Sequence, residues 1–387
     1  MSRRSPRPAP VVLALALVAI VVAASIALVL RLTGDDDPDT KGTATATPTS
    51  APPTTGDITA TPGAPPAGTS DLSPDQRRTV DRLKEQVSDI RGLEWKADLP
   101  VRIVDPGELA RRLNVLTIED REEHPEDLPA VEAVLKLLQL IPPDLDFADT
   151  IDRLLAGGVL GFYDDEAKEL YVGGDPGSDL DVATQATMVH ELTHALTDQN
   201  FDFGARNQAL GERDLSEEIL ALGALVEGDA ELVRILWEEE HLTGQEQVEA
   251  HLGGGADPSV YLDMPPYILE SLFFPYTVGL DFVQTLHDNG GFALVDSAYR
   301  QPPTSSEEIL HPDLYVPGRT WTRPALPDLA AATGCTVLDT STIGEFDMFQ
   351  VLDQELSQSE AEKAVAGWNG DAYGLVRCGT AVGMADR

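Results

Sequence analysis

The segment at residues 188–198, Met-Val-His-Glu-Leu-Thr-His-Ala-Leu-Thr-Asp, constrains the fold of this chain more than any other. Its apolar residues recur with the spacing of one helical face, which predicts a helix with a stripe buried in a core. A neighbouring, solvated face is expected to carry His190, Glu191, His194 and Asp198. Because residues four apart lie on one side of a helix, His190 and His194 can bind one metal ion while Glu191 reaches a water on that ion. The alternative is a pair of surface histidines on an acidic helix.

A catalytic zinc site requires a third protein ligand and keeps a further position for water. Glu227 is the best candidate, because it lies in a second segment of helical apolar spacing, residues 219–233. Small residues would let this helix approach another one closely: they are Gly223, Ala224 and Ala230. Gly228 would weaken a helix by about 1 kcal/mol, which indicates a packing reason for its presence. The alternative for Glu227 is an ordinary position on an acidic helix face.

Two further carboxylates follow the candidate ligands by one helical turn, Glu231 after Glu227 and Asp198 after His194. Each could accept the free ring N–H of a ligating histidine and thereby fix its tautomer. The alternative for each is a solvated carboxylate on its helix, and the sequence does not separate the two interpretations.

Residues 11–30 form an uncharged apolar run of the length that spans a bilayer. Arg3, Arg4 and Arg7 precede it, and a basic flank belongs on the cytoplasmic side, so the rest of the chain is expected outside the cell membrane. A cleavable signal peptide is the alternative, but its apolar region is normally shorter and ends at a small-residue cleavage site. The sequence therefore favours a cytoplasmic tail at residues 1–10 and an uncleaved, single-pass transmembrane anchor at residues 11–30.

A Thr/Pro/Ala-rich stretch, residues 31–72, follows the anchor. It has almost nothing to bury and cannot offset the entropy of ordering, so we expect a disordered, extended stalk.

Globular sequence begins at Ser73 and Pro74, which are typical of a helix start. Helices are predicted at residues 74–90, 106–116, 128–140, 269–288 and 292–299, and a strand at 99–104. Pro275 predicts a kink or a break in its helix.

Residues 158–173 read as a β-hairpin around an acidic turn. The hairpin is either an edge that pairs with an extended substrate or an ordinary part of the core.

Residues 319–387 are expected to form a small C-terminal α/β subdomain that contains both cysteines, Cys335 and Cys378. Outside the cytoplasm such a pair is expected to form a disulfide, and two buried free thiols are the alternative.

The formal net charge is −39. A field of this sign argues against nucleic acid and against anionic membrane surfaces as partners, and it favours solubility. An acidic patch that steers a substrate is the alternative to a generally solvated acidic surface, but the carboxylates are spread along the whole chain.

The His-Glu-Leu-Thr-His-Ala-Leu-Thr-Asp sequence at residues 190–198 resembles the active-site helix of gluzincin zinc metallopeptidases, especially the thermolysin-like ones. Glu-Gly-Asp-Ala at 227–230 resembles the glutamate segment that this family carries on a separate helix. Residues 161–164, 302–307 and 367–371 are more similar to uncharacterised bacterial HExxH proteins. The gap from His194 to Glu227 is longer than in thermolysin itself, and Glu231 stands where that family has an aspartate.

This resemblance implies a helix-rich α+β, zincin-like metallopeptidase domain with a small sheet at residues 73–318, with Zn²⁺ held by His190, His194 and Glu227. Glu191 would be the general base for hydrolysis of a peptide or protein. An oxyanion donor is also needed, and the sequence does not rank the candidates His311, Tyr315, Tyr276 and Tyr299. The alternative is a catalytically silent surface interaction or scaffold protein that retains the fold, although the intact Glu191 favours an enzyme.

Overall fold

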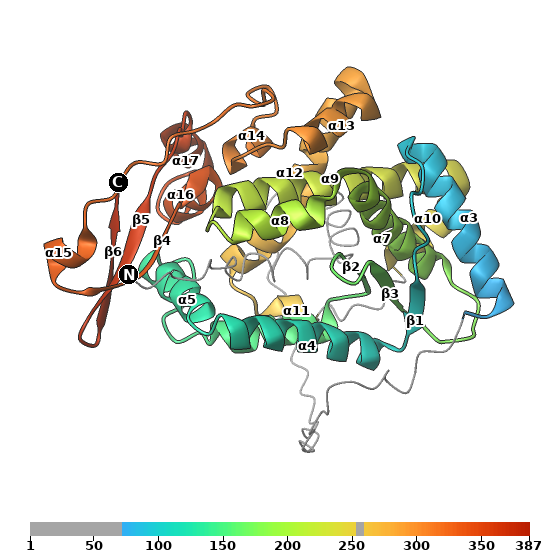
Figure 1. The fold of residues 1–387 in the computed structure, drawn as a ribbon, viewed down its shortest axis with the longest axis horizontal. Coiled ribbons are helices and arrows are strands. Elements are labelled where there is room, and N and C mark those ends of the chain that lie inside the picture. Colours follow the sequence, from blue (N-terminus) through green and yellow to red (C-terminus); the bar gives the residue numbers. More distant parts are fainter. Residues whose placement is uncertain (1–71, 253–258) are drawn as a thin grey trace, which may run out of the picture.

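The computed structural model of the chain describes residues 72–252 and 259–387 (Figure 1). The predicted cytoplasmic tail, the predicted anchor and all but residue 72 of the predicted stalk lie outside the described residues. No helix within the described ranges has both the length and the apolarity needed to cross a bilayer. The described chain is rich in helix and contains two small sheets, which confirms the α+β class.

The first part of the described chain surrounds a small sheet with helices. Ser73 caps α3 (Pro74–Arg91) through a capping box with Gln76, so the predicted helix start is confirmed. The next elements in order are β1 (Val101–Val104), α4 (Pro106–Glu123), α5 (Asp127–Leu137), α6 (Phe147–Gly157), β2 (Gly161–Asp164) and β3 (Glu169–Gly173). α4 is longer than predicted because the next proline, which disfavours helix at the residue before it, is Pro125.

The first sheet has the strand order β1-β3-β2. β1 pairs with β3 in parallel, while β2 and β3 pair antiparallel and place Phe162 opposite Tyr171. The predicted hairpin is therefore confirmed. Within the described residues β2 is an edge strand, and it packs against α7 (Val182–Phe201).

Three long helices form the centre of the molecule: α7, α9 (Ser216–His241) and α12 (Pro266–Gly290). α9 packs against both of the others. Pro275 lies inside α12 without breaking it, so a break at this proline does not occur. The shorter helices around them are α8 (Phe203–Gly211), α10 (Gly244–Leu252), α11 (Ser259–Leu262), α13 (Phe292–Arg300) and α14 (Ser306–Leu310).

The C-terminal elements gather at one end of the molecule (Figure 1). They are α15 (Leu329–Thr333), β4 (Thr336–Ser341), α16 (Gly344–Asp353), α17 (Gln358–Val365), β5 (Tyr373–Cys378) and β6 (Ala381–Asp386). β4, β5 and β6 form an antiparallel sheet in that order. Cys335 and Cys378 form a disulfide, as predicted. The domain boundary at residue 318 stays a prediction.

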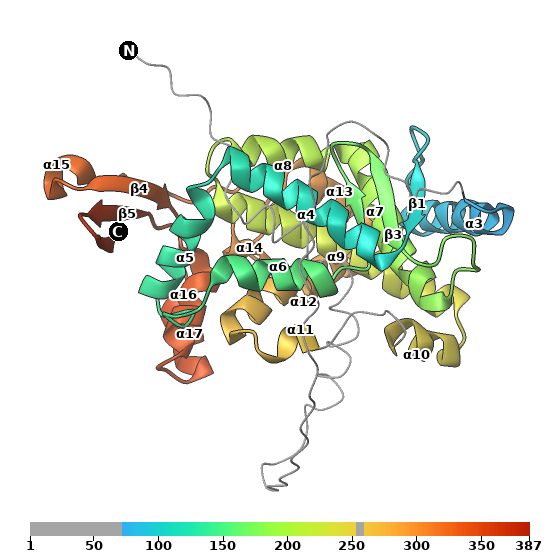
Figure 2. The same cartoon turned by 90° about the horizontal axis from the view of Figure 1, so that it is seen from below.

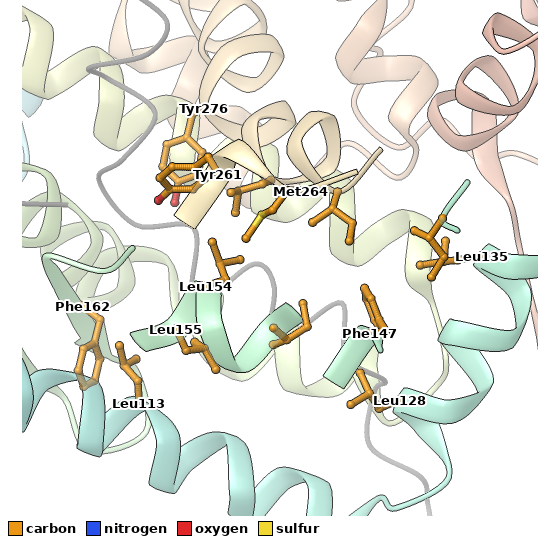
Figure 3. Packing of buried hydrophobic residues seen from close by; sticks show 14 of the residues in the cluster. Leu113, Leu128, Leu135, Phe147, Leu154, Leu155, Phe162, Tyr261, Met264 and Tyr276 are labelled. Atoms are coloured by element: carbon orange, nitrogen blue, oxygen red, sulfur yellow. The ribbon is translucent and has the colours of Figure 1, made fainter. Parts of the chain in front are cut away.

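An apolar cluster joins α4, α5 and α6 to the edge strand β2 and to α12 (Figure 3). α6 packs against both α4 and α11, an arrangement that Figure 2 shows from below. The labelled members of this cluster are Leu113, Leu128, Leu135, Phe147, Leu154, Leu155, Phe162, Tyr261, Met264 and Tyr276. Tyr276 belongs both to this cluster and to the surroundings of His190, so the apolar layer extends up to the α7 histidines.

Candidate metal centre

The α7 helix carries the His-Glu-x-x-His sequence through the middle of the protein. Asp181 caps its start by accepting a hydrogen bond from the Thr184 backbone N–H at 2.8 Å. His190 and Glu191 are 0% exposed and His194 is 4% exposed. The expectation of a solvated polar face was wrong, because β2, β3, α3 and α9 all pack against this helix. The alternative of two surface histidines is excluded by the same burial.

Three side-chain atoms from α7 and α9 form a nearly equilateral triangle. The Nε2 atoms of His190 and His194 are 3.0 Å apart. Oε2 of Glu227 lies 3.1 Å from Nε2 of His190 and 3.3 Å from Nε2 of His194. The structure therefore brings together the three residues that the sequence predicted as ligands, from segments separated by the whole of α8.

Hydrogen bonds account for at most two sides of this triangle, because each ring Nε2 carries at most one proton and cannot donate along two sides at once. A cation bound to all three atoms would account for it. Tetrahedral zinc with ligand distances of about 2.0–2.1 Å separates neighbouring ligand atoms by about 3.3 Å, close to the observed sides of 3.0, 3.1 and 3.3 Å. Imidazole nitrogen and carboxylate oxygen are also donors that zinc takes, so the residues present fit the predicted metal.

Glu191 lies beside the triangle. The nearest His190, Glu191 and His194 ligand atoms all lie within 4.8 Å of one another. Both oxygens of the Glu191 carboxylate are buried, and neither is paired with a side chain among residues 72–252 and 259–387. Burial raises the pKa of Glu191 to about 8; the charge of Glu227 adds to this shift, while the charge of His194 and the backbone of Tyr163 oppose it. A buried carboxyl without a side-chain partner is costly, which is typical of a group kept for a function.

The charges around Glu227 favour its ionised form. Burial by itself would raise the pKa of Glu227, but the charge of His194 and hydrogen bonds from both histidines outweigh it and lower that pKa to about 2. Glu227 is thus held as a carboxylate, the form that binds a metal.

The two predicted outer carboxylates have different surroundings. Oε2 of Glu231 lies 3.5 Å from Nδ1 of His190, which places this carboxylate on the ring nitrogen that faces away from Glu227. Asp198 instead accepts hydrogen bonds from the Tyr163 hydroxyl at 2.9 Å, from the Gly204 backbone at 3.1 Å and from the Lys168 ammonium. These hydrogen bonds hold the Asp198 carboxylate against the β2–β3 hairpin and the start of α8. The possible contact between Asp198 and a ligating histidine is not formed.

α9 and α12 approach each other backbone to backbone at two glycines. A Cβ atom on Gly228 would lie 2.2 Å from the carbonyl oxygen of Gly279, and one on Gly279 would lie 2.3 Å from that of Ala224. The predicted packing reason for Gly228 is thus found, with α12 as the partner helix. Gly228 follows Glu227 directly, so the contact between α9 and α12 lies next to the predicted ligand along α9.

Tyr276 is brought to the site by α12. Its ring lies 6.0 Å from that of His190, centroid to centroid, with an interplanar angle of 21°. The Tyr276 hydroxyl is buried beside the carboxylate of Glu227. Burial raises the pKa of Tyr276 well above its usual value, and the charges of Glu227 and Glu191 add to the shift. The hydroxyl therefore keeps its proton and can act as a donor.

The other three candidate oxyanion donors are engaged elsewhere. His311 pairs with Glu345 at 2.9 Å, and the Tyr315 hydroxyl donates to a backbone carbonyl at 2.6 Å. Tyr299 stacks on Phe201 with ring centroids 4.6 Å apart, and its hydroxyl lies beside Asp229 and Thr197. Of the four candidates, Tyr276 alone has a described contact with a residue of the triangle.

Sequence analysis did not identify Arg234, which contacts Glu231. A signal was present, because Arg234 is the only lysine or arginine in α9 and lies one turn after Glu231. A single basic residue on a buried helix indicates a paired charge.

No protein-family model and no curated protein matches this chain. Among solved structures, the chain is similar to a candidate hydrolase with a novel fold from Chloroflexus aurantiacus, at 19% identity and a TM-score of 0.40, over 61% of this chain and 86% of that one. A similarity of this strength supports no conclusion about function, which depends on the geometry of the site.

Proposed function

We propose that this protein is a zinc-dependent metallopeptidase that hydrolyses peptide bonds in peptides or proteins. The observation that carries the proposal is the triangle formed by His190, His194 and Glu227, with sides of 3.0–3.3 Å, beside the buried carboxyl of Glu191, which has no side-chain partner among the described residues. Two imidazoles and one carboxylate, with a further position left for water, are a donor set of catalytic zinc.

Zinc held by these residues would polarise the substrate carbonyl and make a water molecule at the site more acidic. In its ionised form, which the charge of a nearby Zn²⁺ would favour, Glu191 accepts the proton that this water loses as its oxygen attacks the carbonyl carbon. The same carboxyl then returns the proton to the amine nitrogen when the C–N bond breaks. Its two oxygens are suited to both steps, since no side chain of the described residues has to be displaced first.

Tyr276 is proposed to stabilise the negative charge that develops on the carbonyl oxygen. Its protonated hydroxyl is buried next to the charges of Glu191 and Glu227. A fixed donor in such a water-poor environment interacts more strongly with a developing oxyanion than one in water.

The edge strand β2 is proposed to bind the peptide in an extended conformation. A Cβ atom on Gly161 would lie 3.4 Å from Cγ of Glu191, so the start of β2 borders the general base. An extended chain that adds to a sheet edge is held through its own backbone groups. The substrate would then be positioned largely independently of its side chains.

The proposed location is the outer side of the cell membrane, with the predicted anchor at residues 11–30. The arginines that precede this segment support a cytoplasmic N-terminus. The disulfide between Cys335 and Cys378 supports an oxidising compartment for the folded domain.

The proposal is tested with the purified full-length protein, a mixed peptide library and a metal analysis. The wild type and Glu191→Gln should each bind about one zinc ion per chain, but only the wild type should cleave peptides. Chelation should abolish cleavage and added zinc should restore it. Glu239→Gln, on the exposed side of α9, is the control and should cleave normally. Wild-type protein that binds no zinc, or undiminished cleavage by Glu191→Gln, would contradict the proposal, and zinc binding without any cleavage would favour an interaction protein.

A further inference from the structure

A buried chain of charged side chains continues outward from the His190 ring along α9. Glu231, Arg234 and Glu238 are each less than 10% exposed, and they are spaced by about one helical turn. At the far end, the second oxygen of Glu238 lies 3.2 Å from Nε2 of His251 on α10. Four side chains therefore connect the predicted metal ligand to a neighbouring helix.

Arg234 holds the carboxylate of Glu231 by two nitrogens at once. Its Nε donates to Oε2 of Glu231 at 2.9 Å, and its Nη2 donates to Oε1. Such a two-point contact fixes the plane of a carboxylate as well as its distance. Oε2 is also the atom that faces Nδ1 of His190 at 3.5 Å. The orientation of the group that faces His190 is therefore set by Arg234.

The guanidinium is itself held from both sides. Its Nη1 pairs with Glu238, four residues further along α9, so that it lies between two carboxylates of its own helix. A buried side chain with this many partners has little freedom to rotate. The restriction passes through Glu231 to the imidazole of His190.

We infer that Arg234 is a positioning residue for the metal centre, acting through Glu231 to hold the His190 ring with Nε2 turned toward the metal. The inference rests on the proposed zinc site. A histidine that binds metal through Nε2 carries its proton on Nδ1, and a fixed carboxylate at Nδ1 selects this tautomer and ring orientation. Loss of such an outer partner typically weakens metal binding by about 10–100-fold.

The chain offers a matched control in Arg91. This arginine is also fully buried between two carboxylates, Asp229 at 3.0 Å and Asp296 at 2.8 Å. Neither carboxylate has a described contact with His190. Substitution of Arg91 should therefore reproduce the cost of disrupting a buried ion pair on α9 without disturbing the histidine.

The test measures zinc affinity of full-length variants by competition with a chromophoric chelator, alongside thermal unfolding. Arg234→Lys keeps the charge but cannot form the two-point contact, and should bind zinc about tenfold more weakly than the wild type. Arg234→Met should bind more weakly still, by up to about 100-fold. Arg91→Lys should lower the melting temperature while the affinity of the folded protein stays within about twofold of the wild type.

A second variant covers the case in which the Arg234 variants do not fold. Glu238→Gln leaves the Glu231–Arg234 contact in place but releases the other side of the guanidinium, and should weaken zinc binding by a few-fold. Equal affinities for the wild type, Arg234→Lys and Glu238→Gln would overturn the inference while leaving the zinc site intact. Equal losses in Arg234→Lys and Arg91→Lys would also overturn it, because the effect would then be one of general stability. A wild type without zinc affinity would overturn the proposed function itself.

Discussion

Gly228→Ala tests whether the close approach of α9 and α12 positions Glu227. The added Cβ would lie 2.2 Å from the carbonyl oxygen of Gly279, whereas ordinary contact begins at 3.4 Å. The obstacle is backbone and cannot rotate away, so the two helices would have to separate by about 1 Å, the difference between these distances.

Two effects of this substitution oppose each other. Alanine favours helix over glycine by about 1 kcal/mol. Overpacking costs about 1–3 kcal/mol or more, and a clash with rigid backbone belongs at the upper end of that range. The clash should win, with a net loss of about 2 kcal/mol and a fall in melting temperature of about 4 °C.

Zinc affinity should report the displacement of Glu227 more directly than stability does. Metal sites tolerate deviations of only about 0.2 Å in ligand distance. A shift of the helix by several times this amount should weaken zinc binding by at least about tenfold. Chelator competition and differential scanning calorimetry on the same preparation provide both values.

Gly244→Ala is the control, because a Cβ atom on this glycine of α10 would meet nothing within 4 Å. It should leave zinc affinity and melting temperature unchanged or slightly improved. The reasoning would be refuted if Gly228→Ala melted at the wild-type temperature and bound zinc with wild-type affinity.

Further expectations concern single groups. Glu227→Gln should weaken zinc binding by about 100-fold or more, as measured by chelator competition, because a neutral amide replaces a charged ligand; unchanged affinity would show that another group is the third ligand. Tyr276→Phe should lower kcat about 10²–10³-fold in steady-state peptide cleavage with zinc content unchanged, and an unchanged kcat would remove it as oxyanion donor. Burial raises the pKa of Glu217 to about 8, so this carboxyl stays protonated in the folded protein below that pH. Its contribution to the free energy of unfolding is therefore present at low pH and is lost as pH rises from its unfolded pKa of about 4.3 toward 8. A series of melting temperatures between these pH values should fall less steeply for Glu217→Gln than for the wild type, and parallel curves would contradict this. Reduction of the Cys335–Cys378 disulfide, which closes a separation of 43 residues, should cost about 3–4 kcal/mol, so an unchanged melting temperature in reductant would argue against its stabilising role.

Local signals predicted the elements of the fold well. The helix starting at Ser73 was predicted because a serine cap and a following proline act within one turn. The hairpin at β2 and β3 followed from two β-rich runs around an acidic turn. The extent of α4 was underestimated, because a helix without a strong breaker continues until tertiary contacts or a proline end it.

The sequence predicted which residues form the site better than it predicted whether they are buried. The polar residues of α7 were expected to face solvent, whereas His190 and Glu191 are fully buried. Helical periodicity shows only that one face is more polar than another, and a polar face can also be buried when it holds a paired or metal-binding set. Asp198 was grouped with the site on spacing alone, but it turns toward Tyr163 and Lys168 of the hairpin.

The sequence by itself determined that His190 and His194 share one face of a helix with Glu191 beside them, because the helical repeat fixes the directions of residues four apart. It also identified Glu227 and Glu231 as the carboxylates to consider. Only the tertiary structure decided that Glu227 meets both imidazoles, that Tyr276 is the donor beside His190, and that Arg234 holds Glu231. Distances between helices depend on how backbones such as those at Gly228 and Gly279 pack, and periodicity within one segment does not contain that information.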